Sequence, residues 1–267
     1  MNTIGLIAGV GRLPVEFARA ARGMGFAVVA IAVAPGVDDE LAQAADRCYA
    51  VGLGELDKLL ATLKQEAVNQ VTLLGKVTKE HLFSGAARPD ARMQRLLAGL
   101  KDLNDDTVML ALVREFAGEG IGVLDQTELI RQLMPTAGIL TKRQPSPEEQ
   151  GDMEFGLTMA RQIGGLDIGQ TVVVKNRAVL AVEAIEGTDA CIRRGGQLGR
   201  GGVIVAKAAK PQQDLRFDVP SVGPDTLKAM IEIGAAALVI EAGKTLLVDK
   251  QQVIDLADNN GIAIAAM

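Results

Sequence analysis

Apolar residues in the first third of the chain form short continuous runs that alternate with segments of helical spacing. The runs at Thr3–Ala8, Ala27–Val33 and Val71–Gly75 predict strands covered on both faces, because they do not alternate with polar residues. Leu13–Met24 and Glu55–Glu66 repeat their apolar residues at helical intervals. Strands that alternate with helices in this way predict a parallel sheet with crossover connections.

The rest of the chain has a less regular order of elements. Two helices are predicted between Asp90 and Gly118, and a short strand at Ile121–Leu124. Thr171–Val174 and Ala178–Ala184 flank a Lys-Asn-Arg turn and predict a β-hairpin. Further elements are predicted as helices at Pro147–Ile163, Thr188–Arg194, Pro224–Ile233 and Lys250–Asp258, and as strands at Val203–Ala206, Ala237–Ile240, Thr245–Val248 and Ile262–Ala265.

A cluster of residues that break regular structure separates these two regions. Pro135, Gly138 and Pro145 all fall within residues 135–146, which is the best linker candidate in the chain. The sequence therefore predicts two α/β domains, at residues 1–134 and 147–267, which agrees with a length of 267 residues.

Composition excludes several classes of protein. Aromatic residues are scarce and the formal charge is −5, so we expect no nucleic-acid partner. No apolar run reaches the roughly 18 residues of a membrane span, and no secretory signal is found at the N-terminus, so the chain is predicted to be cytoplasmic. Cys48 and Cys191 are interpreted as reduced, buried hydrophobic residues. A single histidine, His81, rules out zinc sites built on several histidines and leaves oxygen ligands, which suit Mg²⁺ or Mn²⁺.

Two predicted strand ends in the first domain carry candidate nucleotide-binding residues. Gly9 and Gly11 end the first strand just before a helix that begins at Leu13, and a helix N-terminus attracts phosphate. A dinucleotide fingerprint needs a third glycine where this chain has Pro14, so a phosphate site is favoured over an NAD site; a simple tight turn is the alternative. Lys76 and Thr78 follow another strand and could meet phosphate or ribose, unless Lys76 is only a surface lysine.

The second domain has a candidate metal and phosphate site after its hairpin. Glu183 and Glu186 leave a strand, and Thr188 or Asp189 can cap the helix that carries Arg193. Carboxylates at a strand end can bind a hard cation, and arginine can bind phosphate oxygens. The alternative is a helix cap beside solvated glutamates.

Residues 206–223 concentrate further charges in a segment without helical spacing. Lys207 and Lys210 precede Arg216 and Asp218, which share one side of an extended chain and could orient a phosphate and a cation. An exposed ion pair of little energetic value is the alternative. The other acidic residues at predicted helix ends are interpreted as capping or solvated carboxylates; they are Asp152, Asp225, Asp255 and Asp258.

Four motifs together resemble one enzyme family along almost the whole chain. They are I-A-G-x-G-x-L-P at 7–14, L-D-I-G-Q at 166–170, A-V-E-A-I-E-G-T-D at 181–189 and K-P-x-Q-D-x-R-x-D-x-P-x-x-G at 210–223. This pattern resembles the LpxI-type UDP-2,3-diacylglucosamine pyrophosphatases. The sequence departs from that pattern in a glycine-rich segment at 195–202, which looks shortened, and in Lys76, where some members have Asn.

The resemblance implies a fold, a reaction and a set of site residues. It implies an N-terminal Rossmann-like parallel-sheet domain, a C-terminal mixed α/β catalytic domain and a substrate cleft between them. The implied reaction is Mg²⁺-dependent hydrolysis of UDP-2,3-diacylglucosamine to UMP and 2,3-diacylglucosamine 1-phosphate in lipid A biosynthesis, by water attack on the α-phosphorus. The family's essential aspartate falls on Asp218.

From the resemblance and the residue chemistry together, roles are expected for individual side chains. The catalytic candidates are Asp218, Arg216 and Lys210, and the metal candidates are Asp218, Glu183 and Glu186. The substrate-binding candidates are Gly9, Gly11, Leu13, Lys76, Thr78, Gln170, Thr188, Asp189, Arg193 and Lys207. Which carboxylate binds metal and which activates water stays open, as do acyl-chain preference and oligomeric state.

Two other functions remain as alternatives. A NAD-dependent oxidoreductase would use the glycine turn at residues 9–11. A non-catalytic sugar-nucleotide-binding protein would also suit two α/β domains. The expected partner is a UDP-linked diacylated glucosamine, and such a lipid substrate implies peripheral contact with the inner membrane.

Overall fold

The computed structural model describes residues 2–77, 89–103, 105–211, 214–217 and 219–267. The chain divides into two compact units. Residues 1–130 form the first unit together with the three-residue segment Leu215–Phe217. Residues 131–214 and 218–267 form the second unit. The chain therefore returns to the first unit for three residues late in its course.

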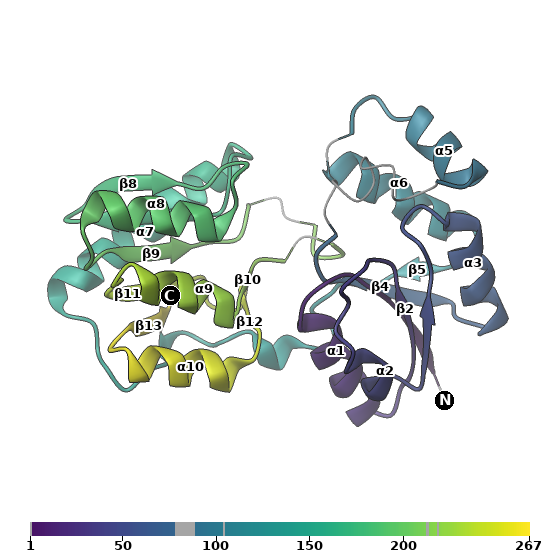
Figure 1. Ribbon diagram of the computed structural model, residues 1–267, viewed down its shortest axis with the longest axis horizontal. Helices are drawn as coiled ribbons and strands as arrows, with labels where there is room; N and C mark the ends of the chain where they lie inside the picture. The colour runs from purple at the N-terminus through teal and green to yellow at the C-terminus, as the bar shows by residue number, and fades with distance from the viewer. Residues whose placement is uncertain (1, 78–88, 104, 212–213, 218) are drawn as a thin grey trace. The chain divides into compact units, whose positions relative to one another are not determined.

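A five-stranded parallel sheet forms the centre of the first unit (Figure 1). Its strands are β1 (Thr3–Ala8), β2 (Ala27–Ala32), β3 (Arg47–Ala50), β4 (Gln70–Leu74) and β5 (Gly122–Val123), in the order β3-β2-β1-β4-β5. The helices are α1 (Leu13–Gly23), α2 (Leu41–Ala44), α3 (Leu56–Gln65), α5 (Ala91–Ala98) and α6 (Asp105–Gly118). The strand order reverses between β1 and β4.

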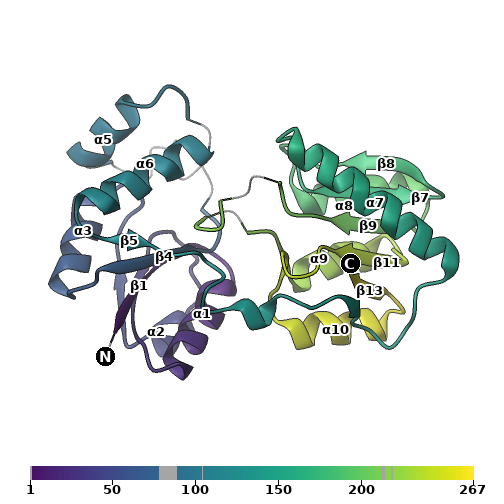
Figure 2. The ribbon, with the colours of Figure 1, turned by 180° about the vertical axis from the view of Figure 1, so that it is seen from behind.

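Apolar side chains from both layers make the core of the first unit. Ile31 and Val71 of the sheet lie in one cluster with Leu60 and Leu63 of α3 and Phe116 of α6. Helices α1 and α2 lie against the opposite face of the sheet (Figure 2). Strands β1, β2 and β4 are mostly buried on both faces, which explains why their sequences show no alternation.

A six-stranded mixed sheet forms the centre of the second unit. Its order is β6 (Gly138–Ile139), β13 (Ala263–Ala266), β11 (Ala237–Ile240), β9 (Ile204–Lys207), β7 (Thr171–Lys175) and β8 (Ala178–Val182). Strands β9, β11 and β13 are parallel, whereas β6, β7 and β8 are antiparallel to their neighbours. The other elements are α7 (Pro147–Gly165), α8 (Thr188–Gly199), α9 (Pro224–Glu232), α10 (Lys250–Asn259), the 3-10 helix η1 (Arg131–Leu133) and a small parallel pair, β10 (Ser221–Val222) and β12 (Leu246–Leu247).

Successive residues of β7 point into two different apolar cores. Val172 and Val174 lie in one cluster with Met153 of α7. Val173 lies in the other, with Ile192 of α8 and residues of α9 and α10. The second unit therefore has three layers, with α7 on one face of the sheet and α8, α9 and α10 on the other.

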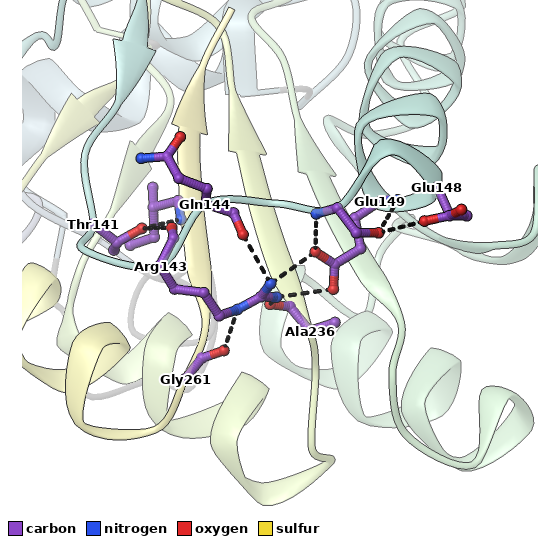
Figure 3. Close-up of polar contacts among 9 residues, drawn as sticks. Thr141, Arg143, Gln144, Glu148, Glu149, Ala236 and Gly261 are labelled. Carbon is purple, nitrogen blue, oxygen red and sulfur yellow. Dashed lines mark hydrogen bonds and ion pairs between the residues drawn. The ribbon is translucent and has the colours of Figure 1, made fainter.

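Residues of the predicted linker take part in the second unit. Strand β6 pairs with β13, and Arg143 makes a two-pronged ion pair with Glu149, with both N···O distances 2.8 Å (Figure 3). The same guanidinium donates to the carbonyl oxygens of Ala236 and Gly261, at 2.7 and 2.6 Å. Arg143 thus ties the start of α7 to the segments that lead into β11 and β13.

The α/β class is confirmed, with a parallel sheet in one unit and a mixed sheet in the other. Several elements differ from the prediction, and β6 and β10 are two short strands that the sequence pattern did not predict. Strand β3 was not predicted, because its residues Arg47, Cys48 and Tyr49 lie at the sheet edge and are mostly exposed. Helix α8 runs through Gly195 and Gly196 to Gly199, five residues beyond its predicted end at Arg194. None of the described helices combines the length and apolar character needed to span a bilayer.

Candidate active site

Two segments that sequence analysis selected separately lie side by side in the first unit. Gly9 follows β1 and donates its N–H to the carbonyl oxygen of Leu74 at the end of β4, at 2.8 Å. Val10 and Lys76 then exchange two backbone hydrogen bonds of 2.9 and 2.7 Å. This bridge lies where the strand order reverses, which is where open α/β sheets bind ligands.

Glycine is required on both sides of this bridge. A Cβ atom on Gly9 would lie 2.7 Å from the carbonyl oxygen of Lys76. A Cβ atom on Gly75 would lie 2.7 Å from the carbonyl group of Gly9, and the φ angle of Gly75 is +92°. Both contacts are shorter than real Cβ atoms make. The glycines therefore serve the close approach of two backbones.

The N-terminus of α1 opens beside the same bridge. Gly11 is exposed, has a φ angle of +117° and has open space where a side chain would project. Leu13 is the first residue of α1, and no side chain caps the helix at Arg12. Uncapped N–H groups at a helix N-terminus suit a phosphate. Thr78 and His81 lie outside the described residues.

Arg12 sits next to this turn and pairs with acidic residues that follow β2. Its guanidinium lies 3.1 Å from Asp38 and 2.8 Å from Glu40. Hydrogen bonds from Arg12 and then Arg19 lower the pKa of Glu40 below its ordinary value. In dinucleotide-binding sheets an acidic residue in this region binds ribose. Here Asp38 and Glu40 bind arginine instead.

A chain of polar side chains lies at one end of the second sheet. Lys207, the last residue of β9, is only 8% exposed, and its Nζ donates to the Thr188 hydroxyl at 3.1 Å. The Thr188 hydroxyl in turn donates to Oε1 of Glu183 at 2.8 Å. Residues from β9, α8 and the end of β8 thus meet in one cluster.

Gln170 joins this cluster through the backbone. Its carbonyl oxygen accepts the N–H of Ala208 at 3.1 Å, so it lies beside Lys207. Oε1 of Gln170 and Oε2 of Glu183 are both buried and have no hydrogen-bond partner. A Cβ atom on Gly169 would lie 2.1 Å from the carbonyl oxygen of Glu183, so only glycine fits there. Buried polar atoms without partners are costly, which makes this cluster a candidate binding site.

Two other candidates of the second unit, Glu186 and Arg193, bind partners outside this cluster. Glu186 accepts from Arg194 at 2.5 Å and from the N–H of Ala184 at 3.1 Å. The hydrogen bond from Arg194, first among several causes, lowers the pKa of Glu186. Arg193 donates to Glu232 of α9 at 2.7 Å. Asp189 lies in the first turn of α8.

The charged segment before β10 is described only in part. Nζ of Lys210 lies 2.7 Å from the Asp167 carboxylate. Arg216 is half-buried and belongs to the segment that joins the first unit. Asp218 lies outside the described residues. Its catalytic and metal roles stay predictions.

Among the described residues, Glu183 and Glu186 differ in how well they fit a divalent cation. They contain no group of three or more His, Cys, Asp or Glu side chains that could hold a metal ion. Glu183 fits a ligand role, because one of its carboxylate oxygens is buried without a partner. Glu186 fits less well, because Arg194 and a backbone N–H already engage its oxygens.

Three polar residues that the sequence analysis missed or misjudged are also buried. Asp152 is 8% exposed, and its carboxylate accepts the N–H groups of Asn176 and Arg177 at 2.7 and 2.6 Å. The interpretation of Asp152 as a helix-terminal or solvated carboxylate is therefore wrong. Gln126 and Glu241 are each 6% exposed. Glu241 directly follows a fully apolar predicted strand, which is the same signal that selected Glu183.

The two cysteines are both free thiols. Cys191 is fully buried, and burial raises the pKa of its thiol to about 12, so it stays protonated at neutral pH. Cys48 is exposed at the edge strand β3, so the prediction that it is buried is wrong.

Comparison with known proteins gives matches along the whole chain. Residues 3–133 match the LpxI N-terminal domain, and residues 136–265 match the LpxI C-terminal domain. A curated relative, the UDP-2,3-diacylglucosamine pyrophosphatase LpxI of Caulobacter vibrioides, is 37% identical over 277 residues. That alignment covers 99% of this chain and 97% of the relative.

Solved structures give much weaker likenesses. A glycinamide-RNase-transformylase T from Mycobacterium tuberculosis is 16% identical, with a TM-score of 0.27, over 52% of this chain and 38% of its own. The biotin carboxylase subunit of a pyruvate carboxylase is 13% identical, also with a TM-score of 0.27, over 68% of this chain and 36% of its own. Neither likeness is strong enough to inform the site.

Proposed function

The chain belongs to the LpxI family, and we propose that it hydrolyses UDP-2,3-diacylglucosamine to UMP and 2,3-diacylglucosamine 1-phosphate in lipid A biosynthesis. On this family membership the chain is an enzyme, a pyrophosphate hydrolase. The observation that carries the proposal is that 37% identity extends over 99% of the chain, so that both units match. A Rossmann-like first domain and a substrate cleft between the domains are further parts of the proposal.

The first unit supplies the proposed nucleotide site. The bridge between Val10 and Lys76 leaves the N-terminus of α1 open at Gly11, where backbone N–H groups can bind a phosphate of the UDP group. Lys76 belongs to the same bridge, so its backbone lies beside this turn, and its side chain is proposed to add positive charge there. The turn therefore orients the substrate by backbone contacts that need no dinucleotide fingerprint.

The second unit supplies the proposed charge stabilisation. Attack of water on the α-phosphorus adds negative charge to the phosphate oxygens, and a buried cation offsets it well because little water screens it. Lys207 is such a cation, and its ammonium group donates to Thr188, whose hydroxyl is itself held by Glu183. Lys210 and Arg216 are proposed to add positive charge nearer the phosphate that leaves with the sugar.

A bound Mg²⁺ would neutralise pyrophosphate charge and lower the pKa of a bound water. Glu183 and Asp218 are the proposed ligands. Asp218 either takes this role or orients the attacking water, and both roles require its carboxylate. Gln170 and Thr188 would then contact the sugar, whose hydroxyl groups can donate to the buried Gln170 oxygen.

The experiment that tests this proposal follows ¹⁸O from labelled water into the products by mass spectrometry, with Mg²⁺ or with EDTA. We expect ¹⁸O in UMP and no products under EDTA. Asp218→Asn is expected to abolish turnover. Asp225→Asn is the matched control and should retain it, because Asp225 is 84% exposed and pairs only with Lys228 at 2.8 Å among the contacts described.

Each other outcome identifies a different error in the proposal. Label in the lipid phosphate would keep the substrate but refute attack at the α-phosphorus. Full activity of Asp218→Asn would refute both roles of that residue. Binding of the intact substrate without cleavage under any divalent cation would favour the sugar-nucleotide-binding alternative.

The dinucleotide alternative has less support from the structure. Pro14 lies in the first turn of α1 where the fingerprint needs a third glycine. Asp38 and Glu40, the acidic residues after β2, are engaged by Arg12. A nicotinamide dinucleotide would have to displace that arginine to reach them.

A further inference from the structure

Two described parts of the charged segment are held by buried polar residues that lie far away in the sequence. The first part begins at the end of β9 and contains Lys207 and Lys210. The second part, Leu215–Phe217, contains Arg216. Glu241 contacts the first part and Gln126 contacts the second. Neither of these two residues belongs to the motifs that identify the family.

Gln126 fixes Leu215–Phe217 within the first unit. Its backbone N–H donates to the carbonyl oxygen of Leu215 at 2.8 Å, one residue before Arg216. Its side-chain amide donates to the carbonyl oxygen of Leu73 near the end of β4. Gln126 is 6% exposed. It lies in a turn in which the Asp125 carboxylate accepts the N–H of Thr127 at 2.7 Å. The segment with Arg216 is therefore tied to the strand that leads into the Val10–Lys76 bridge.

Glu241 fixes the start of the charged segment within the second unit. Its Oε2 accepts the N–H of Ala209 at 3.1 Å, directly before Lys210. Its Oε1 accepts from Lys244 and from Arg161, at 3.0 and 3.2 Å. Glu241 is 6% exposed. Its two cationic partners come from different segments: Arg161 from α7 and Lys244 from the residues after β11.

We propose that Gln126 and Glu241 are positioning residues, which hold Arg216 and the Lys207–Lys210 segment in the geometry that hydrolysis requires. This inference rests on the proposed function. Preorganised charges are effective only at the right place, and a misplacement of about 1 Å can cost on the order of a hundredfold in rate. Neither residue needs to touch the substrate.

The test uses the full-length chain with Gln126→Ala, Glu241→Ala and Glu241→Gln, measuring kcat and KM for UDP-2,3-diacylglucosamine and backbone amide exchange. Asp46→Ala and Glu149→Ala are matched controls. Each removes a carboxylate that accepts a backbone N–H, from Val28 and Ser146 at 2.8 Å in both cases, away from the charged segment.

We expect kcat to fall by about tenfold or more in Gln126→Ala and Glu241→Ala, with a much smaller change in KM. Amide exchange should become faster at Ala209 in Glu241→Ala, and at the backbone N–H of position 126 in Gln126→Ala. Glu241→Gln keeps an oxygen for Ala209 and should retain more of kcat. The controls should lose thermal stability to a similar degree without the fall in kcat.

Two results would overturn the inference: unchanged exchange at Ala209 and Gln126, or an equal fall in kcat in the controls. Failure of the proposed function is distinguishable, because the unmodified chain would then not cleave the substrate. The exchange measurements would still decide whether the two residues hold the segment.

Discussion

Single buried carboxylates organise the backbone of the second unit. Asp152 accepts two successive N–H groups from the turn between β7 and β8, where Asn176 and Arg177 have φ angles of +50° and +55°. Such angles give the tight turn that matches the twist of a hairpin, but they are unfavourable for arginine. The two charge-assisted hydrogen bonds offset that cost.

Glu149 gives a pH-dependent prediction at the same scale. Hydrogen bonds from Arg143, opposed by burial, hold its pKa below the ordinary value of 4.5. A carboxylate with a lowered folded-state pKa stabilises the protein above its unfolded pKa, and that stability is lost as pH falls through the folded pKa. Glu149→Gln should therefore lower the free energy of unfolding by about 1 to 3 kcal/mol at neutral pH.

Urea denaturation of both proteins between about pH 7 and about pH 3 measures this difference. The difference between wild type and Glu149→Gln should shrink toward the acid end, because the wild-type carboxylate becomes protonated. A difference that stays constant over the whole range would contradict the ionised Arg143–Glu149 pair shown in Figure 3.

At the scale of elements, glycines let α8 pack closely against its neighbours. A Cβ atom on Gly195 would lie 2.5 Å from Cβ of Val173 in β7. A Cβ atom on Gly196 would lie 2.3 Å from Cβ of Ile233 at the end of α9. The helix therefore continues through residues of low helix propensity, because tertiary packing outweighs that propensity.

Gly196→Ala is expected to destabilise the protein by about 1 to 3 kcal/mol, because Ile233 has to move or α8 has to shift. Gly118→Ala is the control, since a Cβ atom at the end of α6 meets nothing within 4 Å, and it should be neutral or stabilising by up to about 1 kcal/mol. Chemical denaturation measures both. Equal stability of Gly196→Ala and wild type would show that α8 packs less closely than described.

At the scale of the whole molecule, the two alternative functions, UDP-sugar hydrolysis and NAD-dependent oxidation, predict different ligands for the first unit. UMP bound to the full chain should slow amide exchange at Gly11 and Arg12, at the N-terminus of α1. NAD should leave these amides unchanged. Hydrogen exchange with each ligand tests this prediction, with the amides of Glu55 and Leu56 at the start of α3 as the internal reference. Protection by NAD but not by UMP would favour the oxidoreductase.

The sequence by itself determined the α/β class, most helices and strands, and the family. Continuous apolar runs such as Ala237–Ile240 show strand content directly, because burial on both faces leaves no place for polar residues. The four motifs identified the family, because they extend along almost the whole chain. Local patterns and motif order carry this information without reference to contacts.

Only the tertiary structure decided which candidate residues meet. The sequence did not predict that Gly9 contacts Gly75, or that Lys207, Thr188 and Glu183 form one cluster. It also did not predict that Leu215–Phe217 belongs to the first unit. All of these contacts link segments that are distant in the sequence. The sequence also could not show that Glu186 and Arg193 are engaged by Arg194 and Glu232. The physical reason is that hydrogen bonds and close backbone approaches depend on strand order and register, which residue type and spacing do not specify.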